Sequence, residues 1–120
     1  MENTDSERIR QIIKTRKKAH SWFLKRSEVY RSFTVMEQNT YAVGKLSKKQ
    51  KELIATGISV VINCESCMEW HIKQALDHGA TEAEIVEAIE VGIEMGGGPA
   101  TASARFAMNV LEYYRDSENS

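Results

Sequence analysis

Proline, cysteine and long apolar runs are all scarce in this sequence of 120 residues. It holds one proline, Pro99, and two cysteines, Cys64 and Cys67. Proline in a helix interior removes a hydrogen bond and clashes with the preceding turn, so a chain with one proline is free to be helical along most of its length. The apolar runs are short and broken by charge, whereas a membrane-spanning helix needs roughly 20 apolar residues. We therefore expect no membrane-spanning segment.

Export signals are missing as well. The first residues, Met-Glu-Asn-Thr-Asp, lack the basic start and the apolar stretch of a secretory signal. We therefore expect a cytoplasmic protein. Because a purely structural disulfide is rare in that reducing compartment, the two cysteines are better explained as a catalytic, redox-sensing or metal-binding pair.

Excess charge is absent overall, since the formal net charge is only -1. The charges are nevertheless sorted along the chain. From Arg8 to Arg31 there are nine lysines and arginines against one acid, and from Glu65 to Glu94 there are eight acids against one base. A basic helix that packs near an acidic one, within a subunit or across to another, explains this sorting better than a nucleic-acid partner does.

Composition and periodicity predict one all-α domain over residues 1–120. The chain is 42% hydrophobic and 28% charged, and most segments repeat apolar residues at helical spacing. This pattern is typical of a bundle of about six helices. Helix starts are predicted by three capping boxes and one further candidate cap: Thr4 with Glu7, Ser47 with Gln50, Thr81 with Glu84, and Asn63.

Two of the predicted helices carry apolar faces that we expect to be buried. The helix over about 27–41 would bury Val29, Tyr30, Phe33 and Met36 or Val35. The helix over about 47–62 has a broader face and is therefore expected at the centre of the fold. That face consists of Leu53, Ile54, Ile58, Val61 and Ile62.

The stretch from Asn63 to His71 holds both cysteines and a histidine. If it opens a helix, Cys64 and Cys67 lie one turn apart, and His71 lies one turn further along the same face. Two thiols at this spacing can close a short disulfide, and a helix N-terminus favours the thiolate form of a cysteine. This pattern is typical of a redox-active dithiol with a base beside it.

The spacing of residues around Asn63 also predicts a carboxylate partner for His71, namely Glu52. If the helices before and after Asn63 fold back on each other, Glu52 comes within about one helical turn of the height of His71, which a glutamate side chain can bridge. Glu52, His71 and Cys67 would then form a proton relay. The pattern leaves two alternatives open. The cysteines could be small buried apolar residues, or Cys64, Cys67 and His71 could bind zinc with Glu52 or His78, although no second ligand pair is present.

Several motifs together resemble the carboxymuconolactone decarboxylase and alkylhydroperoxidase D-like superfamily. They are Glu52–Ile54, Cys64–His71, Ala75–Thr81, Glu84–Ala88 and the glycine corner at Gly96–Pro99. The resemblance covers a core over residues 45–110 and leaves the basic helices of residues 1–43 as an N-terminal addition. It implies an all-α helical bundle that assembles into a homo-oligomer, usually a trimer or a hexamer.

The resemblance also implies an activity, because the peroxidase branch of this family has its functional residues at Glu52, Cys64, Cys67 and His71. Cys67 would attack a hydroperoxide after deprotonation through His71 and Glu52, and Cys64 would resolve the sulfenic acid to a disulfide. A thiol or dithiol reductant, such as a lipoyl protein or a thioredoxin-like carrier, would regenerate the pair. No cofactor, metal, nucleic acid or membrane is needed.

Two comparisons within the superfamily bear on that activity. Alkylhydroperoxidase D has a histidine just before its second cysteine, where this chain has Ser66. Members that decarboxylate carboxymuconolactone typically lack the cysteine pair. The presence of the pair here therefore argues against decarboxylation. The alternatives to the peroxidase are a carboxymuconolactone decarboxylase-like enzyme, or a non-catalytic redox-sensing or metal-binding module.

Overall fold

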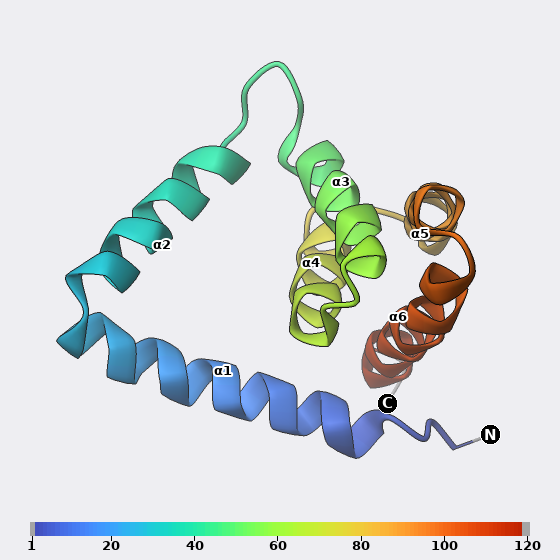
Figure 1. The fold of residues 1–120 in the computed structure, drawn as a ribbon, viewed down its shortest axis with the longest axis horizontal. Helices are drawn as coiled ribbons and strands as arrows, with labels where there is room; N and C mark the ends of the chain where they lie inside the picture. Colours follow the sequence, from blue (N-terminus) through green and yellow to red (C-terminus); the bar gives the residue numbers. More distant parts are fainter. Residues whose placement is uncertain (1, 119–120) are drawn as a thin grey trace.

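The computed structural model describes residues 2–118, which form six α-helices and no strand (Figure 1). The predicted all-α fold of about six helices is confirmed. None of the helices in this range is both long and apolar enough to cross a membrane. In chain order the helices are α1 (Ser6–Arg26), α2 (Glu28–Tyr41), α3 (Lys48–Val61), α4 (Glu65–Asp77), α5 (Glu82–Gly96) and α6 (Gly98–Glu118).

Local capping chemistry fixes most of the helix starts. The predicted capping boxes at Ser47 and Thr81 are both present, each with its reciprocal pair of hydrogen bonds. The capping box at Thr4 is wrong, because α1 begins at Ser6 after Asp5, which makes no side-chain cap. The carboxylate of Asp5 instead accepts a hydrogen bond of 2.7 Å from the side chain of Asn109 on α6. The Asp5 carboxylate, which could have capped α1, is therefore engaged in a contact with α6.

The α3 helix lies at the centre of the fold, packed against α4 and α5 (Figure 1). Its buried residues, however, are mostly small or polar, and include Ala55, Gly57 and Ser59. The prediction that its large apolar face is buried is therefore wrong for four of the five residues, because Ile54, Ile58, Val61 and Ile62 are all exposed.

Close approach of α3 and α5 explains this reversal. A Cβ atom added to Gly92 on α5 would meet the carbonyl oxygen of Gly57 at 2.6 Å. Since real Cβ atoms do not come so near to a backbone oxygen, glycine at this crossing lets the two backbones touch. Burying the narrow face of α3 brings the helices closer together and leaves its wide apolar face outside.

The first two helices form an arm that only partly rests on the bundle (Figure 1). The first half of α1 is anchored by Ile9, which is completely buried. Further along, Arg16 forms an ion pair with the buried carboxylate of Glu69 on α4, which also accepts a hydrogen bond from the Tyr114 hydroxyl of α6. These contacts tie α1 to α4 and α6.

The second half of the arm has no buried anchor. Ser27 ends α1 and caps α2, accepting a hydrogen bond of 3.0 Å from the backbone N–H of Tyr30. The α2 helix buries none of its residues. The predicted burial of Val29, Phe33, Val35 and Met36 is therefore wrong, because all four side chains are exposed. Their helical spacing is right, but α2 swings away from the core that they would have joined (Figure 1).

Candidate active site

The sharp turn between α3 and α4 positions the first cysteine. Asn63 takes a left-handed conformation with φ of 54°, which asparagine tolerates better than most residues. The N–H groups of Asn63 and Cys64 bond to the carbonyl oxygens of Val60 and Ser59, at 3.3 and 3.0 Å. This pairing is a Schellman motif that closes α3. Asn63 thus ends α3. The prediction that Asn63 caps α4 is wrong.

Cys64 caps α4 in its place. Its sulfur accepts a hydrogen bond of 3.2 Å from the backbone N–H of Cys67. The two cysteines, both half-buried, form a disulfide across this first turn, with their Cα atoms 5.2 Å apart. A sulfur that accepts a hydrogen bond at a helix N-terminus is stabilised as a thiolate when the disulfide opens.

His71 and Glu52 are joined as the fold-back of α3 on α4 suggested. The Nδ1 atom of His71 lies 2.7 Å from Oε1 of Glu52, and Glu52 is buried, with 1% of its surface exposed. Because a carboxylate only accepts hydrogen bonds, Nδ1 carries the proton and Nε2 is left with a free lone pair. The buried carboxylate therefore fixes the tautomer of the neutral imidazole, in which Nε2 is the atom that can accept a proton.

The structure thus brings together two pairs, Cys64 with Cys67 and Glu52 with His71. His71 lies one helical turn beyond Cys67 on the same face of α4. Within residues 2–118 no hydrogen bond joins His71 to either sulfur. In the disulfide neither sulfur has a proton to transfer.

Two further residues complete the site, and sequence reasoning missed both. Lys48 extends its ammonium group to 3.3 Å from Oε2 of Glu52, so the buried carboxylate is shared between a lysine and a histidine. Tyr41, the last residue of α2, places its ring against the imidazole of His71 with the centroids 5.3 Å apart. The Lys48 ammonium lies 5.5 Å from the centre of the same tyrosine ring.

The sequence indicates the position of Lys48 in the site but not that of Tyr41. Lys48 lies four residues before Glu52, which is the spacing of an ion pair on one helix face, so the contact could have been found. No spacing links Tyr41 to His71, because the contact depends on how α2 returns to α3. Burial, with a smaller contribution from the negative charges of Glu52 and Glu37, raises the pKa of Tyr41. Tyr41 therefore stays protonated near neutral pH and offers a ring and a neutral hydroxyl.

Of the donors considered for zinc, Glu52 and His71 are in direct contact, whereas the sulfurs of Cys64 and Cys67 are bonded to each other. No three histidine, cysteine or acidic side chains within residues 2–118 converge as a metal-binding group. His78, the fourth ligand considered, lies exposed at the far end of α4, and its Nδ1 atom is 2.8 Å from the carbonyl oxygen of Gln74.

Comparison with known proteins places this arrangement in a family. The model of the carboxymuconolactone decarboxylase family matches residues 27–109, which is more than half of the chain. The chain belongs to the carboxymuconolactone decarboxylase family. The family match begins earlier than the motifs over residues 45–110 and includes α2, the helix that carries Tyr41.

Two curated proteins that are similar to this chain in sequence are themselves uncharacterised. Uncharacterized protein 4 in the cox locus of Paracoccus denitrificans is 41% identical over 81 residues, covering 68% of this chain and 73% of that protein. An uncharacterised protein of Cupriavidus necator is 41% identical over 71 residues, covering 59% of this chain and 60% of that one.

Solved structures extend the likeness to nearly the whole fold. A carboxymuconolactone decarboxylase family protein from Legionella pneumophila has a TM-score of 0.80 and 28% identity, covering 89% of this chain and 97% of that one. A carboxymuconolactone decarboxylase family protein from Thermotoga maritima, described as "possibly involved in antioxidative response", has a TM-score of 0.84 and 27% identity, covering 91% of this chain and 93% of that one. The family fold therefore extends over most of this chain.

Proposed function

We propose that this protein is a cytoplasmic thiol-dependent peroxidase or disulfide oxidoreductase that reduces hydroperoxides through Cys64 and Cys67. One observation carries the proposal: a disulfide at the start of α4 lies one turn from an imidazole whose tautomer is fixed by a buried carboxylate. The description of the Thermotoga maritima protein, which mentions an antioxidative response, agrees with this chemistry.

The oxidative half-reaction begins from the dithiol. His71 accepts the proton of the Cys67 thiol at Nε2, while Glu52 holds the other ring nitrogen and stabilises the imidazolium that forms. The Cys67 thiolate attacks the terminal oxygen of the hydroperoxide, the O–O bond breaks, and the leaving alkoxide takes the proton and departs as an alcohol. Cys67 is left as a sulfenic acid.

The second step closes the disulfide. The Cys64 thiol gives up its proton and its sulfur attacks that of Cys67; the S–O bond breaks, and the hydroxyl group takes up this proton and leaves as water. The capped position of Cys64, whose sulfur accepts the N–H of Cys67, suits it to act as a thiolate here and as the leaving group when a reductant later attacks Cys67. A thiol or dithiol reductant, such as a lipoyl protein or a thioredoxin-like carrier, supplies two electrons and restores both thiols.

Stopped-flow measurement of thiol loss in the reduced protein, with hydrogen peroxide and with an organic hydroperoxide, tests these roles. Cys67→Ser should abolish the fast reaction. Cys64→Ser should still react and accumulate a sulfenic acid on Cys67 that dimedone traps. Equal rates in Cys67→Ser and the wild type would overturn the assignment.

A second variant tests the relay. Glu52→Gln keeps the size of the side chain but removes its charge, so it should slow thiol oxidation by about 10- to 1,000-fold while the helical content stays unchanged. Unchanged kinetics would exclude the relay. A lactone decarboxylase activity that survives when both cysteines become serine would point to the other branch of the family.

A further inference from the structure

A pocket of about 520 Å³ lies where the two arm helices meet α4. Residues of α1 and α2 line most of it, and Trp70 of α4 completes it. We call it the arm pocket. Glu52, Cys64, Cys67 and His71 are not among its lining residues, so it is separate from the candidate active site. Cavities of this size that combine apolar surface with a few converging polar groups are typical binding sites for small molecules.

Arg16 on α1 supplies a positive charge that is already held in place. Its guanidinium donates one hydrogen bond to the buried carboxylate of Glu69 and stacks on the ring of Trp70, 4.8 Å from the centroid. A guanidinium has five N–H groups in a planar fork. Within residues 2–118 the side chain of Arg16 makes no other hydrogen bond to the protein. Arg16 therefore retains N–H groups that a ligand in the arm pocket can use.

The charges that line the arm pocket are mainly positive. Lys17 adds a second cation beside Arg16, and it has no ion-pair partner within residues 2–118. Glu37 on α2 is the single acid among the described residues that line the pocket. Glu69 is completely buried, and its two oxygens accept from Arg16 and Tyr114, so it offers a ligand no free oxygen. Lysine and arginine thus exceed the acids of the lining by one charge.

Aromatic rings form the apolar part of the arm pocket. Tyr30 and Phe33 of α2 line it together with Trp70. The Tyr30 hydroxyl lies 2.8 Å from Nδ1 of His20, and its ring stacks on Phe23 with the centroids 5.3 Å apart. A ring that is already fixed in this way can contact a flat apolar molecule at little cost in ordering.

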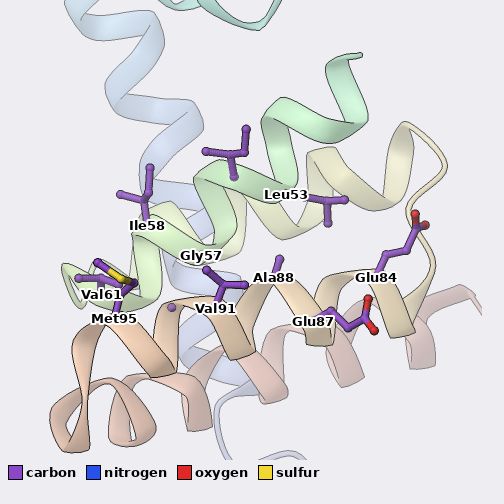
Figure 2. A pocket seen from close by; sticks show the side chains of 11 residues that line it. Leu53, Gly57, Ile58, Val61, Glu84, Glu87, Ala88, Val91 and Met95 are labelled. Atoms are coloured by element: carbon purple, nitrogen blue, oxygen red, sulfur yellow. The ribbon is translucent and has the colours of Figure 1, made fainter. Parts of the chain in front are cut away.

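A second hollow in the molecule lacks this combination. The groove between α3 and α5, with a volume of about 430 Å³, is lined by apolar side chains and by two carboxylates, Glu84 and Glu87 (Figure 2). Among the described residues that line it there is no cation and no aromatic ring. An organic anion therefore favours the arm pocket over this groove.

We propose that the arm pocket binds a small aromatic carboxylate. The carboxylate accepts hydrogen bonds from the guanidinium fork of Arg16, whose geometry matches two carboxylate oxygens, and from the ammonium of Lys17. The ring of the ligand lies against Tyr30 and Phe33. A ligand with one negative charge balances the excess positive charge of the lining. It also bridges α1, α2 and α4, and so ties α2, which buries none of its own residues, to the bundle. The inference does not depend on the proposed peroxidase chemistry.

The fluorescence of Trp70 measures this binding in the disulfide form of the protein. The chain has two tryptophans, and Trp22→Phe, at an exposed residue outside the pocket, leaves Trp70 as the only one. Benzoate is the probe, with benzyl alcohol and benzylamine as its neutral and cationic counterparts. Benzoate should change the emission with a dissociation constant of about 1 mM or lower, and both counterparts should bind at least about tenfold more weakly. No change at about 10 mM benzoate, or tighter binding of either counterpart, would overturn the proposal.

Further substitutions in the Trp22→Phe background locate the bound carboxylate. Lys17→Met should raise the dissociation constant for benzoate about two- to fivefold, whereas Lys18→Met, at the next residue and outside the pocket, should leave it unchanged. Glu37→Gln removes the opposing charge and should lower it. Met95→Ala, in the α3–α5 groove, should have no effect. Circular dichroism shows whether each variant keeps its helices. Equal effects of the two lysine variants, weaker binding in Glu37→Gln, or weaker binding in Met95→Ala would each overturn the proposal.

Discussion

Replacing Lys48 with methionine should shift the pH dependence of thiol oxidation to higher pH. The Lys48 ammonium lies 3.3 Å from one oxygen of Glu52, and the imidazole of His71 lies 2.7 Å from the other. In the wild type this positive charge opposes protonation of the imidazole and favours the thiolate of Cys67. Without the ammonium group of Lys48, we expect Cys67 and His71 to retain their protons to a higher pH.

The size of the shift follows from the geometry. The ammonium and the imidazole are separated by roughly 8 Å or less, at which two unit charges interact by about 0.5 kcal/mol in water and about 2 kcal/mol at an effective dielectric constant of 20. These limits correspond to about 0.4 and 1.5 pH units. Because the Lys48 side chain is 30% exposed, solvent screening favours the lower half of the range, so we expect a shift of about 0.5 to 1 unit.

The assay is the rate of thiol loss in the reduced protein against an organic hydroperoxide, followed from acid to alkaline pH. The midpoint of the rising limb should move upward in Lys48→Met, while the plateau stays within about threefold, since the reacting groups are unchanged. Lys49→Met is the matched control, because the neighbouring Lys49 pairs with Glu84, outside the site. A midpoint that stays in place or moves downward, or an equal shift in the control, would refute the reasoning.

Three further predictions concern other parts of the structure. Tyr41→Phe should keep the wild-type pH profile and Tyr41→Ala should alter it, because the ring covers the imidazole; equal profiles would exclude a role for the ring. Gly92→Ala should lower the free energy of unfolding by about 1–3 kcal/mol in urea, because its Cβ would press on the backbone of α3. Gly98→Ala, which has open space, should be nearly neutral, and an equal loss in both would contradict the close packing. Burial raises the pKa of Tyr114 to about 12, above the unfolded value of about 10, so stability that is present below pH 10 should be lost as the pH rises to 12. Tyr114→Phe should lower the unfolding free energy at neutral pH by about 1.5–3 kcal/mol, through the lost hydrogen bond to a buried carboxylate, and should flatten that alkaline loss.

The parts of the fold that depend on local chemistry could be predicted from the sequence. The caps at Ser47 and Thr81 satisfy backbone groups within their own first turns, so neighbouring residues carry the whole signal. The contact between Glu52 and His71 could be predicted for a similar reason. A tight turn at Asn63 forces two adjacent helices back on each other, and the heights of residues on both sides then follow from the rise of the helix.

Features set by long-range packing could not be predicted in this way. Apolar periodicity shows that α3 has a wide apolar face, but it does not show that Gly57 and Gly92 bring the opposite face against α5. In the same way, the pattern of α2 is amphipathic whether its apolar side meets its own core or another molecule. Tyr41 was missed because its contact with His71 depends on the path of the chain between α2 and α3.

The stoichiometry of oxidation tests the central claim most directly. The fully reduced protein is titrated with an organic hydroperoxide, and free thiols, the alcohol product and the Cys64–Cys67 disulfide are quantified together. The account predicts that each hydroperoxide consumed yields one alcohol and one disulfide, with the loss of two thiols. A protein whose two thiols survive excess hydroperoxide, or are oxidised without forming that disulfide, would contradict it.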